Sequence, residues 1–392
     1  MIIAIILIFL VFIGLVTQKY DSKLYIIFCL CCLAGTYLLV NPTSDFDLYR
    51  HYEIYDIVQS LELKEVFQER NYLNNTFTGL LFNQYVTGSP VYIFFVFLCS
   101  RIAGHKLLII VTTILVYGIP MYVIYSVGRD KKYSNGIINL SVIFLILSIN
   151  YLDVSGIRNL LAVSIVCGAA FLDLVKKEKK YLAICGYICA LMIHNSVAIV
   201  ILFRLILLVK SNLIQRICVF ITLFSVILLV EFKEQGFYVD NMGYIGDFIN
   251  NGINRLYNYV VGGGSSVSIV SSNFLWLNLV ARIASMVSIA IIFFRTKNMG
   301  EKFEQYDKFL LLIGAFVMSA TVQYDLFVRM QFFLVVFVTP KLPSYFELST
   351  GNKISSIKCK SAFSTLSLCL LIVLENVLFW LISYRALDSC IF

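Results

Sequence analysis

Charged residues are scarce in this chain of 392 residues: only 14% are charged, whereas 60% are hydrophobic. An ordinary soluble domain is about half apolar and about a quarter charged, so this composition excludes one. The apolar excess lies in long runs such as Leu140–Ile149, Val219–Val230 and Leu366–Leu374. A helix needs roughly 20 mostly apolar residues to cross a bilayer, whereas β-barrel strands would alternate apolar and polar residues. We therefore predict an all-α, polytopic transmembrane helical bundle.

Several familiar nucleotide and metal signatures are also missing. The sequence has no P-loop and no dinucleotide-binding fingerprint, which argues against a function driven by ATP or built on a nucleotide cofactor. The eleven cysteines lie mostly inside apolar runs. We interpret them as small packing residues rather than as disulfides or metal ligands. The sequence thus predicts no cofactor, no metal ion and no nucleic-acid partner.

The basic residues indicate which side of the membrane is the inside. The net charge is +8, and Lys and Arg gather in short segments between the apolar runs. These segments lie at 19–23, 129–132, 176–180, 210–216, 295–308 and 341–360. By the positive-inside rule they face the cytoplasm. We therefore predict a multi-pass membrane protein with these segments on the cytoplasmic side.

About twelve spans alternate between these segments and leave both termini outside. They fall at 1–16, 24–40, 107–127, 135–150, 157–175, 181–193, 195–209, 213–231, 273–294, 308–323, 326–342 and 361–383. The first run has no basic stretch before it and no small-residue cleavage site after it, so we interpret it as a retained span. Pro90–Gly104 would break the alternation, and we interpret it as an interfacial or re-entrant helix on the outer face. Residues 1–392 then form a single transmembrane domain.

Two long loops, at 41–89 and 232–273, are predicted outside, which places binding or chemistry at the outer face. The first loop begins with carboxylates and aromatic rings in close succession, together with one arginine. These residues are Asp45, Asp47, Tyr49, Arg50 and Tyr52. Aromatic faces stack on sugar rings and carboxylates accept hydroxyl protons, so the run favours a sugar-binding cleft. An aromatic belt at the membrane interface is the alternative.

Arg158 opens the span 157–175 at its outer end, beside Asn159 and after the helix breaker Gly156. A charged side chain inside a span costs roughly 2.5–3.5 kcal/mol, so its presence calls for a reason. A guanidinium at that position is suited to grip a diphosphate through paired hydrogen bonds. The alternative is an anchor that reaches to the membrane interface.

His194 and Asn195 lie at the turn of a hairpin between two basic segments. Only about 29 residues, 181–209, make the round trip. Each arm of about 14 residues is roughly 21 Å long, short of a full crossing. We therefore expect His194 to lie in a cavity below the outer surface, as a general base or a hydrogen-bond donor. A helix-capping or buried structural histidine is the alternative.

Three further arginines lie within predicted spans. Arg282 belongs to a polar stripe that we expect to face the bundle interior. Arg329 follows Asp325 by four residues, so the two side chains either pair on a helix or leave the arginine to bind an anion. Arg204 lies near the cytoplasmic end of its span, and we interpret it as an anchor at the membrane surface.

Four short motifs occur in an order that is familiar from one family. They are Asp45-Phe-Asp-Leu-Tyr-Arg-His-Tyr52, Ile157-Arg-Asn-Leu-Leu-Ala162, His194-Asn-Ser196 and Val328-Arg-Met-Gln-Phe-Phe333. Together they resemble the EpsG-like branch of the Wzy-type O-antigen and capsule polymerases. The resemblance covers most of the chain, although that family usually has Gln where this sequence has Asn159.

The resemblance implies a GT-C-like membrane glycosyltransferase at the outer face of the bacterial cytoplasmic (inner) membrane. It would join oligosaccharide repeat units carried on undecaprenyl diphosphate, for O-antigen, capsule or exopolysaccharide. The diphosphate of one lipid-linked chain leaves, so no ATP is needed. On this hypothesis the catalytic residues are Asp47, His194 and Arg158. The substrate-binding residues are Asp45, Tyr49, Arg50, Tyr52, Asn159, Asn195, Arg282 and Arg329. A chain-length regulator protein is an expected partner besides the membrane lipid.

Other outer-face functions compete with this one. A flippase or transporter for the same lipid-linked sugar predicts repeated halves with broken helices, whereas the chain has no evident internal repeat and only five prolines. An O-antigen ligase or an acyltransferase would act at the same face. A ligase would concentrate basic residues in one large external loop, whereas the second loop here has only Lys233 and Arg255. A structural membrane partner would explain neither Arg158 nor His194.

Overall fold

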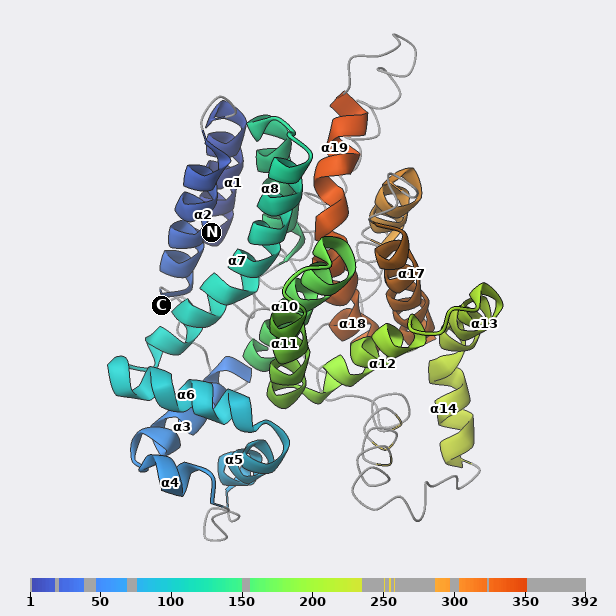
Figure 1. Cartoon of the computed structure of the whole chain (residues 1–392). Helices are drawn as coiled ribbons and strands as arrows, with labels where there is room; N and C mark the ends of the chain where they lie inside the picture. The colour runs from blue at the N-terminus through green and yellow to red at the C-terminus, as the bar shows by residue number, and fades with distance from the viewer. Residues whose placement is uncertain are drawn as a thin grey trace, which may run out of the picture.

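A computed structural model describes residues 2–17, 21–38, 47–68, 76–149, 156–234, 250, 254, 257, 286–296, 303–322 and 324–350. Every regular element within these ranges is helical, which confirms the all-α prediction (Figure 1). A single hydrophobic core runs through nearly all of these helices. The predicted spans 273–294 and 361–383 lie partly or wholly outside the described residues.

The N-terminal half forms two groups of helices. The first consists of α1 (Ile2–Val16), α2 (Ser22–Leu38), α7 (Lys106–Asp130) and α8 (Asn135–Ser148). The second comes from the sequence between α2 and α7, most of which was predicted as an external loop. It consists of α3 (Asp47–Gln59), α4 (Leu63–Val66), α5 (Phe77–Gly88) and α6 (Pro90–Ile102). It covers one end of the first group (Figure 1).

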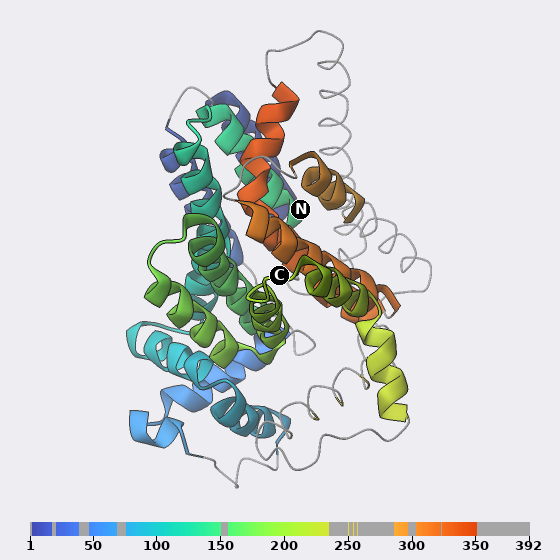
Figure 2. The same cartoon turned by 45° about the vertical axis from the view of Figure 1, so that its right-hand side comes forward.

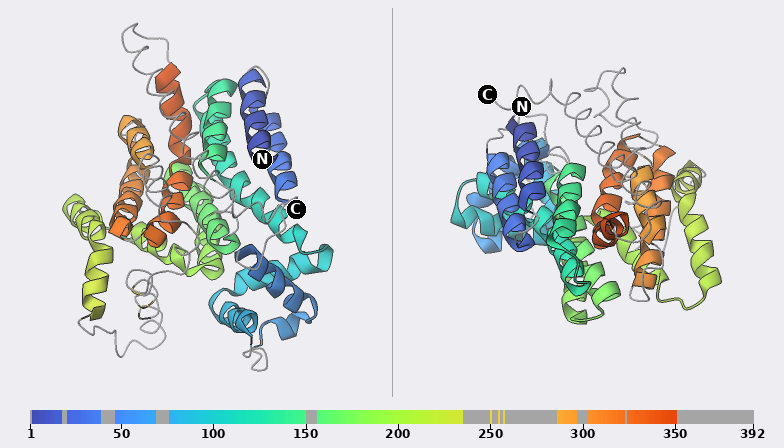
Figure 3. Two further views of the ribbon diagram at one scale, coloured as in Figure 1. Left: turned by 180° about the vertical axis from the view of Figure 1, so that it is seen from behind. Right: turned by 90° about the horizontal axis from the view of Figure 1, so that it is seen from above.

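A central hairpin follows. It consists of α10 (Ile157–Ala170), the π-helical turn η3 (Phe171–Lys176), α11 (Lys180–Ile193), the short η4 (Asn195–Val197) and α12 (Ala198–Ile206). The last group consists of α13 (Asn212–Leu223), α14 (Ser225–Glu234), the helix Met286–Thr296, α17 (Glu304–Ser319), η7 (Ala320–Val322), α18 (Tyr324–Phe337), η8 (Thr339–Lys341) and α19 (Leu342–Thr350). The hairpin packs on α7 and also on α17 and α18, while α19 of the last group packs directly on α8 (Figures 2 and 3).

The described part of the chain contains helices that are long and apolar enough to span a membrane. Two continuous helices, Lys106–Asp130 and Ile157–Lys176, are long and apolar enough to cross a bilayer. Two bent pairs, α5 with α6 and α13 with α14, also pass if each pair counts as one span. The described residues also include six shorter apolar helices of 10–17 residues. The chain is therefore a helical membrane protein.

The basic segments, predicted to share one side of the membrane, come close together in space. Lys176, at the end of η3, pairs with Asp130 at the end of α7. The Lys131 ammonium lies 5.5 Å from the centre of the Phe303 ring, just before α17. Lys341 of η8 lies 4.7 Å from the same ring. Four segments far apart in the sequence thus meet at one end of the bundle.

Arg204, interpreted from the sequence as a surface anchor, has a specific partner instead. Its guanidinium donates two hydrogen bonds to the Asp173 carboxylate, one of them from Nη2 at 3.2 Å. The hydroxyl of Tyr187 donates to the same carboxylate at 3.3 Å. Because these three residues come from α12, η3 and α11, the ion pair fastens the central hairpin together near its basic end.

Within the central hairpin, α10 and α11 pack in close contact. A Cβ atom added at Gly186 of α11 would lie 2.9 Å from the Cβ of Ala169 of α10. Carbon atoms prefer about 3.5–4.0 Å, so only glycine permits this approach. Small residues serve this purpose in membrane helices because the backbones can then pack directly. The packing sets the distance between the start of α10 and the end of α11.

Candidate functional site

Helix α3 carries the acidic and aromatic run that the sequence singled out. Its buried face consists of Leu48, His51, Tyr52, Ile54, Tyr55 and Val58, and this face packs on α6. Asp47, in the first turn, accepts a hydrogen bond from Arg50 Nη1 at 3.2 Å. Both side chains are exposed, so the pair contributes little stability. Asp47 and Arg50 lie at the accessible rim of α3.

A sharp bend between α5 and α6 lies beside α3. The two helices meet at 115°, with Ser89 at the corner and Pro90 opening α6. Proline suits the first helical position because its missing N–H would have no partner there. The Ser89 amide donates to the Tyr85 carbonyl at 2.8 Å, which closes α5. The corner therefore places Tyr85, Ser89 and Tyr92 near one another.

Arg158 lies against this corner. Its Nη1 donates a hydrogen bond to Ser89 Oγ at 3.1 Å. Its guanidinium carbon lies 3.5 Å from the centre of the Tyr85 ring and 5.7 Å from that of Tyr92. Aromatic faces attract a cation through the ring quadrupole without removing its charge. These neutral contacts orient a half-buried guanidinium at the N-terminal end of α10, where the helix dipole adds positive potential.

His51 links α3 to the same corner, and the sequence analysis did not single it out. Its Nδ1 lies 2.7 Å from the Tyr92 hydroxyl, and the two rings meet edge to face with centres 5.4 Å apart. The side chain is buried. Burial lowers the pKa of His51 well below its usual value, and repulsion from Arg158, His194 and Arg50 lowers it further. His51 is therefore a neutral hydrogen-bonding residue near neutral pH.

His194 caps the short helix η4, as the structural alternative predicted. The backbone amide of Ser196 donates to His194 Nδ1 at 3.1 Å. The Ser196 hydroxyl lies 2.7 Å from that nitrogen and donates to Asn159 Oδ1 at 2.9 Å. An Nδ1 that accepts the amide proton leaves the proton of neutral His194 on Nε2. In that tautomer Nε2–H is the ring's donor group.

The two sets of contacts converge because Arg158 and Asn159 are neighbours at the start of α10. One set runs from Arg158 through Ser89, Tyr85 and Tyr92 to His51. The other runs from Asn159 through Ser196 to His194. The candidate site therefore draws on α3, the α5–α6 corner, the start of α10 and the tip of the α11–α12 hairpin.

The other predicted site residues have varied positions. Tyr49 is exposed, and Asn195 is half-buried in η4. Tyr52 is buried, and its ring centre lies 4.4 Å from that of His105. Burial raises the pKa of Tyr52 to about 12. This tyrosine packs inside the α3 group rather than presenting an open ring face.

Three predicted residues cannot be placed in the site. Asp45 and Arg282 lie outside the described residues. Arg329 belongs to α18, as does Asp325, but the side chains of both lie outside what the structure describes. Their roles stay predictions. Within the described ranges, no group of three or more His, Cys, Asp or Glu side chains is arranged to hold a metal ion.

Comparison with known proteins gives one match. No curated protein and no solved structure matches the chain. The model of the EpsG family matches residues 43–385, which include α3, the α5–α6 corner, α10 and the hairpin tip. Since this match spans most of the chain, the resemblance seen in the four short motifs is confirmed, and the protein belongs to the EpsG family.

Proposed function

We propose that this membrane protein polymerises oligosaccharide repeat units carried on undecaprenyl diphosphate, at the outer face of the bacterial cytoplasmic membrane. The family supports a role in polysaccharide biosynthesis. The observation that carries the proposal is the position of Arg158, held by Ser89 and Tyr85 beside the His194–Ser196–Asn159 chain. The complete protein, on this proposal, has about twelve spans and a GT-C-like architecture.

The chemistry is a displacement at an anomeric carbon. A hydroxyl oxygen of the acceptor sugar attacks C1 of the donor, and the bond from C1 to the diphosphate oxygen breaks. The hydroxyl proton goes to a base, and the lipid diphosphate leaves with the bonding electrons. Negative charge develops on the leaving oxygen, where a preoriented cation stabilises the transition state more than the ground state. Arg158 supplies that cation.

The acid–base roles follow from the hydrogen bonds. Because Nδ1 of His194 accepts from Ser196, its Nε2–H is suited to donate to the diphosphate or to a sugar hydroxyl. Asp47, exposed at the start of α3, is then the base. In that case His194→Gln, which keeps an N–H donor, retains more polymer than His194→Ala. Equal loss in both variants would contradict the donor role.

Tyr49, Arg50 and Asn195 have accessible or half-buried positions and are proposed to contact the sugar chains. Tyr52, Asn159 and Ser196 are proposed to support those contacts from behind. Asp45, Arg282 and Arg329 keep their predicted substrate-binding roles. A separate chain-length regulator protein is the partner we expect.

The decisive experiment is Arg158→Ala in cells that make the polymer. We expect long chains to disappear while single repeat units persist, with protein levels in the membrane unchanged. Arg158→Lys is the matched control, since it keeps the charge but loses the planar guanidinium that stacks on Tyr85, and we expect intermediate activity. Normal chain lengths in Arg158→Ala would refute the proposal.

A further inference from the structure

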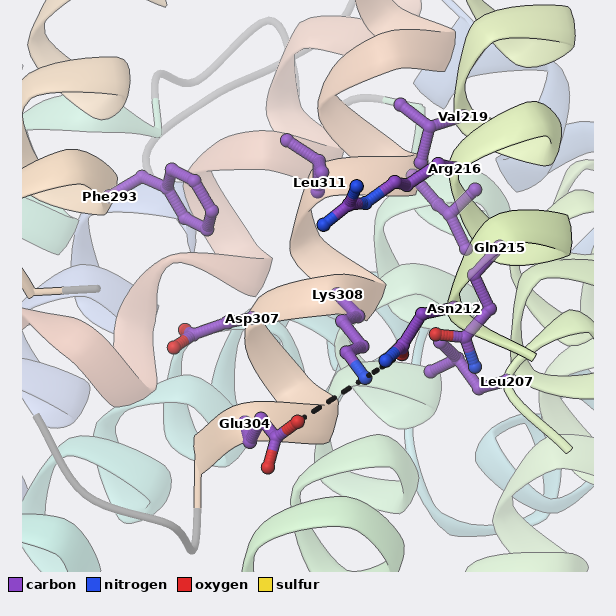
Figure 4. A pocket seen from close by; sticks show the side chains of 11 residues that line it. Leu207, Asn212, Gln215, Arg216, Val219, Phe293, Glu304, Asp307, Lys308 and Leu311 are labelled. Atoms are coloured by element: carbon purple, nitrogen blue, oxygen red, sulfur yellow. Dashed lines mark hydrogen bonds and ion pairs between the residues drawn. The ribbon is translucent and has the colours of Figure 1, made fainter. Parts of the chain in front are cut away.

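A pocket of about 280 Å³ lies between α13 and α17, far from the candidate site. Positions at helical spacing on each helix face it. From α13 these include Asn212, Gln215 and Arg216, and from α17 they include Glu304 and Lys308 (Figure 4). Asp307, also in the lining, pairs with the Lys341 described above, so the pocket is at the basic end of the bundle.

Both carboxylates of the pocket already have cationic partners. Lys308 lies 3.3 Å from Glu304 and donates to Asn212 Oδ1 at 3.0 Å, which joins α17 to α13 (Figure 4). Asp307 turns toward the buried ammonium of Lys341. The acidic side chains are thus neutralised from within the protein, and they do not make the pocket a cation site.

Arg216 differs from these lysines in its partners. Among the described residues it has no acidic partner, and its guanidinium reaches from α13 toward Leu311 of α17 (Figure 4). Next to it, Gln215 donates to the Val209 carbonyl at 2.7 Å. Its Oε1 is buried and has no hydrogen-bond partner within the described ranges. With the two carboxylates paired, Arg216 leaves the pocket with an excess of positive charge.

The rest of the lining is apolar. Leu207, Val219, Phe293 and Leu311 come from four different helices or their ends and meet at this pocket. A small inorganic anion would use the cationic end and leave these side chains without a partner. A phosphate group attached to an acyl chain would use both. The basic segments around the pocket place it, by the positive-inside rule, at the level of the inner leaflet.

We propose that this pocket binds an anionic phospholipid, with the headgroup phosphate on Arg216 and the start of an acyl chain against Val219, Phe293 and Leu311. A guanidinium matches two phosphate oxygens geometrically, and basic pockets between membrane helices on the cytoplasmic side suit such headgroups. The site would brace α13 against α17. The proposed lipid site does not depend on the proposed polymerase activity, and each can be refuted without the other.

The test uses the purified full chain, stripped of lipid in detergent and titrated with phosphatidylglycerol, phosphatidylcholine or inorganic phosphate. Native mass spectrometry measures occupancy. We expect phosphatidylglycerol to bind at least about tenfold more tightly than phosphatidylcholine. A charge-assisted hydrogen bond to the anionic headgroup is strong enough to change the dissociation constant by that factor. Arg216→Gln should remove this preference. Lys210→Gln, which loses the same charge from the adjoining loop, should retain it.

A second variant guards against a folding defect in Arg216→Gln. Leu311→Trp fills the apolar part of the pocket but leaves Arg216 in place. We expect it to block the lipid as well. Equal binding of the two lipids by the unchanged protein, or equal losses in Arg216→Gln and Lys210→Gln, would overturn the proposal. Displacement of phosphatidylglycerol by millimolar inorganic phosphate alone would also overturn it, in favour of a free-phosphate site.

Discussion

The cations near the two ends of helix α10 and its continuation η3 contact different kinds of groups. At the start, Arg158 rests on the Ser89 hydroxyl and the Tyr85 ring, groups that carry no charge. At the far end, Arg204 and Lys341 lie on the carboxylates of Asp173 and Asp307. Carboxylates cancel the charge that they hold, whereas hydroxyls and rings orient it. The first arrangement suits binding of an anion, and the second suits fastening of helices.

Breaking the buried ion pair between Asp307 and Lys341 should have the largest effect on the free energy of unfolding. Asp307→Ala leaves the ammonium of Lys341, which is 1% exposed, without its carboxylate. Such a change costs about 3–5 kcal/mol. Thermal unfolding in detergent measures it. Asp130→Ala is the control, because the Asp130 side chain in its pair with Lys176 is 55% exposed, and this change should cost no more than about 1 kcal/mol. Similar losses in the two variants would contradict the comparison.

Removing a neutral contact of Arg158 should reduce activity instead. Tyr85→Leu takes away the ring face under the guanidinium, a contact of roughly 0.5–2 kcal/mol. We expect polymer yield to fall by about 2- to 30-fold. Tyr85→Phe keeps the ring and should stay close to the unchanged protein. Chain-length profiles on gels separate the two. If Tyr85→Leu produces normal chains, the ring has no positioning role.

The smallest effect concerns pH. Since burial depresses the pKa of His51, the unfolded chain takes up a proton near pH 6.5 that the folded chain does not. Stability from this residue is complete above pH 6.5 and falls as pH drops below it, by at most about 1.4 kcal/mol at pH 5.5. Unfolding temperatures at pH 7.5 and 5.5 test this. His51→Gln should show a smaller difference between the two, and an unchanged difference would rule out His51 as its source.

Arg158 and His194 could be predicted from the sequence because each violates a local rule. A charge inside an apolar span and a hairpin too short to cross a bilayer are visible in a single sequence. His51 and Tyr92 carry no such mark. They matter because the 115° corner after Tyr85 brings together residues that are 41 positions apart in the sequence. Tertiary contacts of this kind leave no periodic pattern.

The segment 41–89, predicted as an external loop, shows the same limit of prediction from sequence. Its polar composition indicated a loop, yet α3 and α5 form there because their apolar residues pack on α6. Tyr52, predicted to face sugars, belongs to that packed face. The helical content and the membrane character were predictable from composition alone. Which face of α3 is buried was not predictable, because tyrosines lie on both its exposed and its buried face.

The tight approach of Gly186 to Ala169 makes the position of His194 depend on the packing between α10 and α11. A methyl group at position 186 would have to push α11 outward by about 0.6–1 Å to restore ordinary carbon spacing. The end of α11 carries His194, whose link to Asn159 passes through Ser196. Displacements near 1 Å can cost about a hundredfold in rate. Gly186 and Ala169 thus fix the position of His194 through the packing of α11 on α10, without contacting the candidate site themselves.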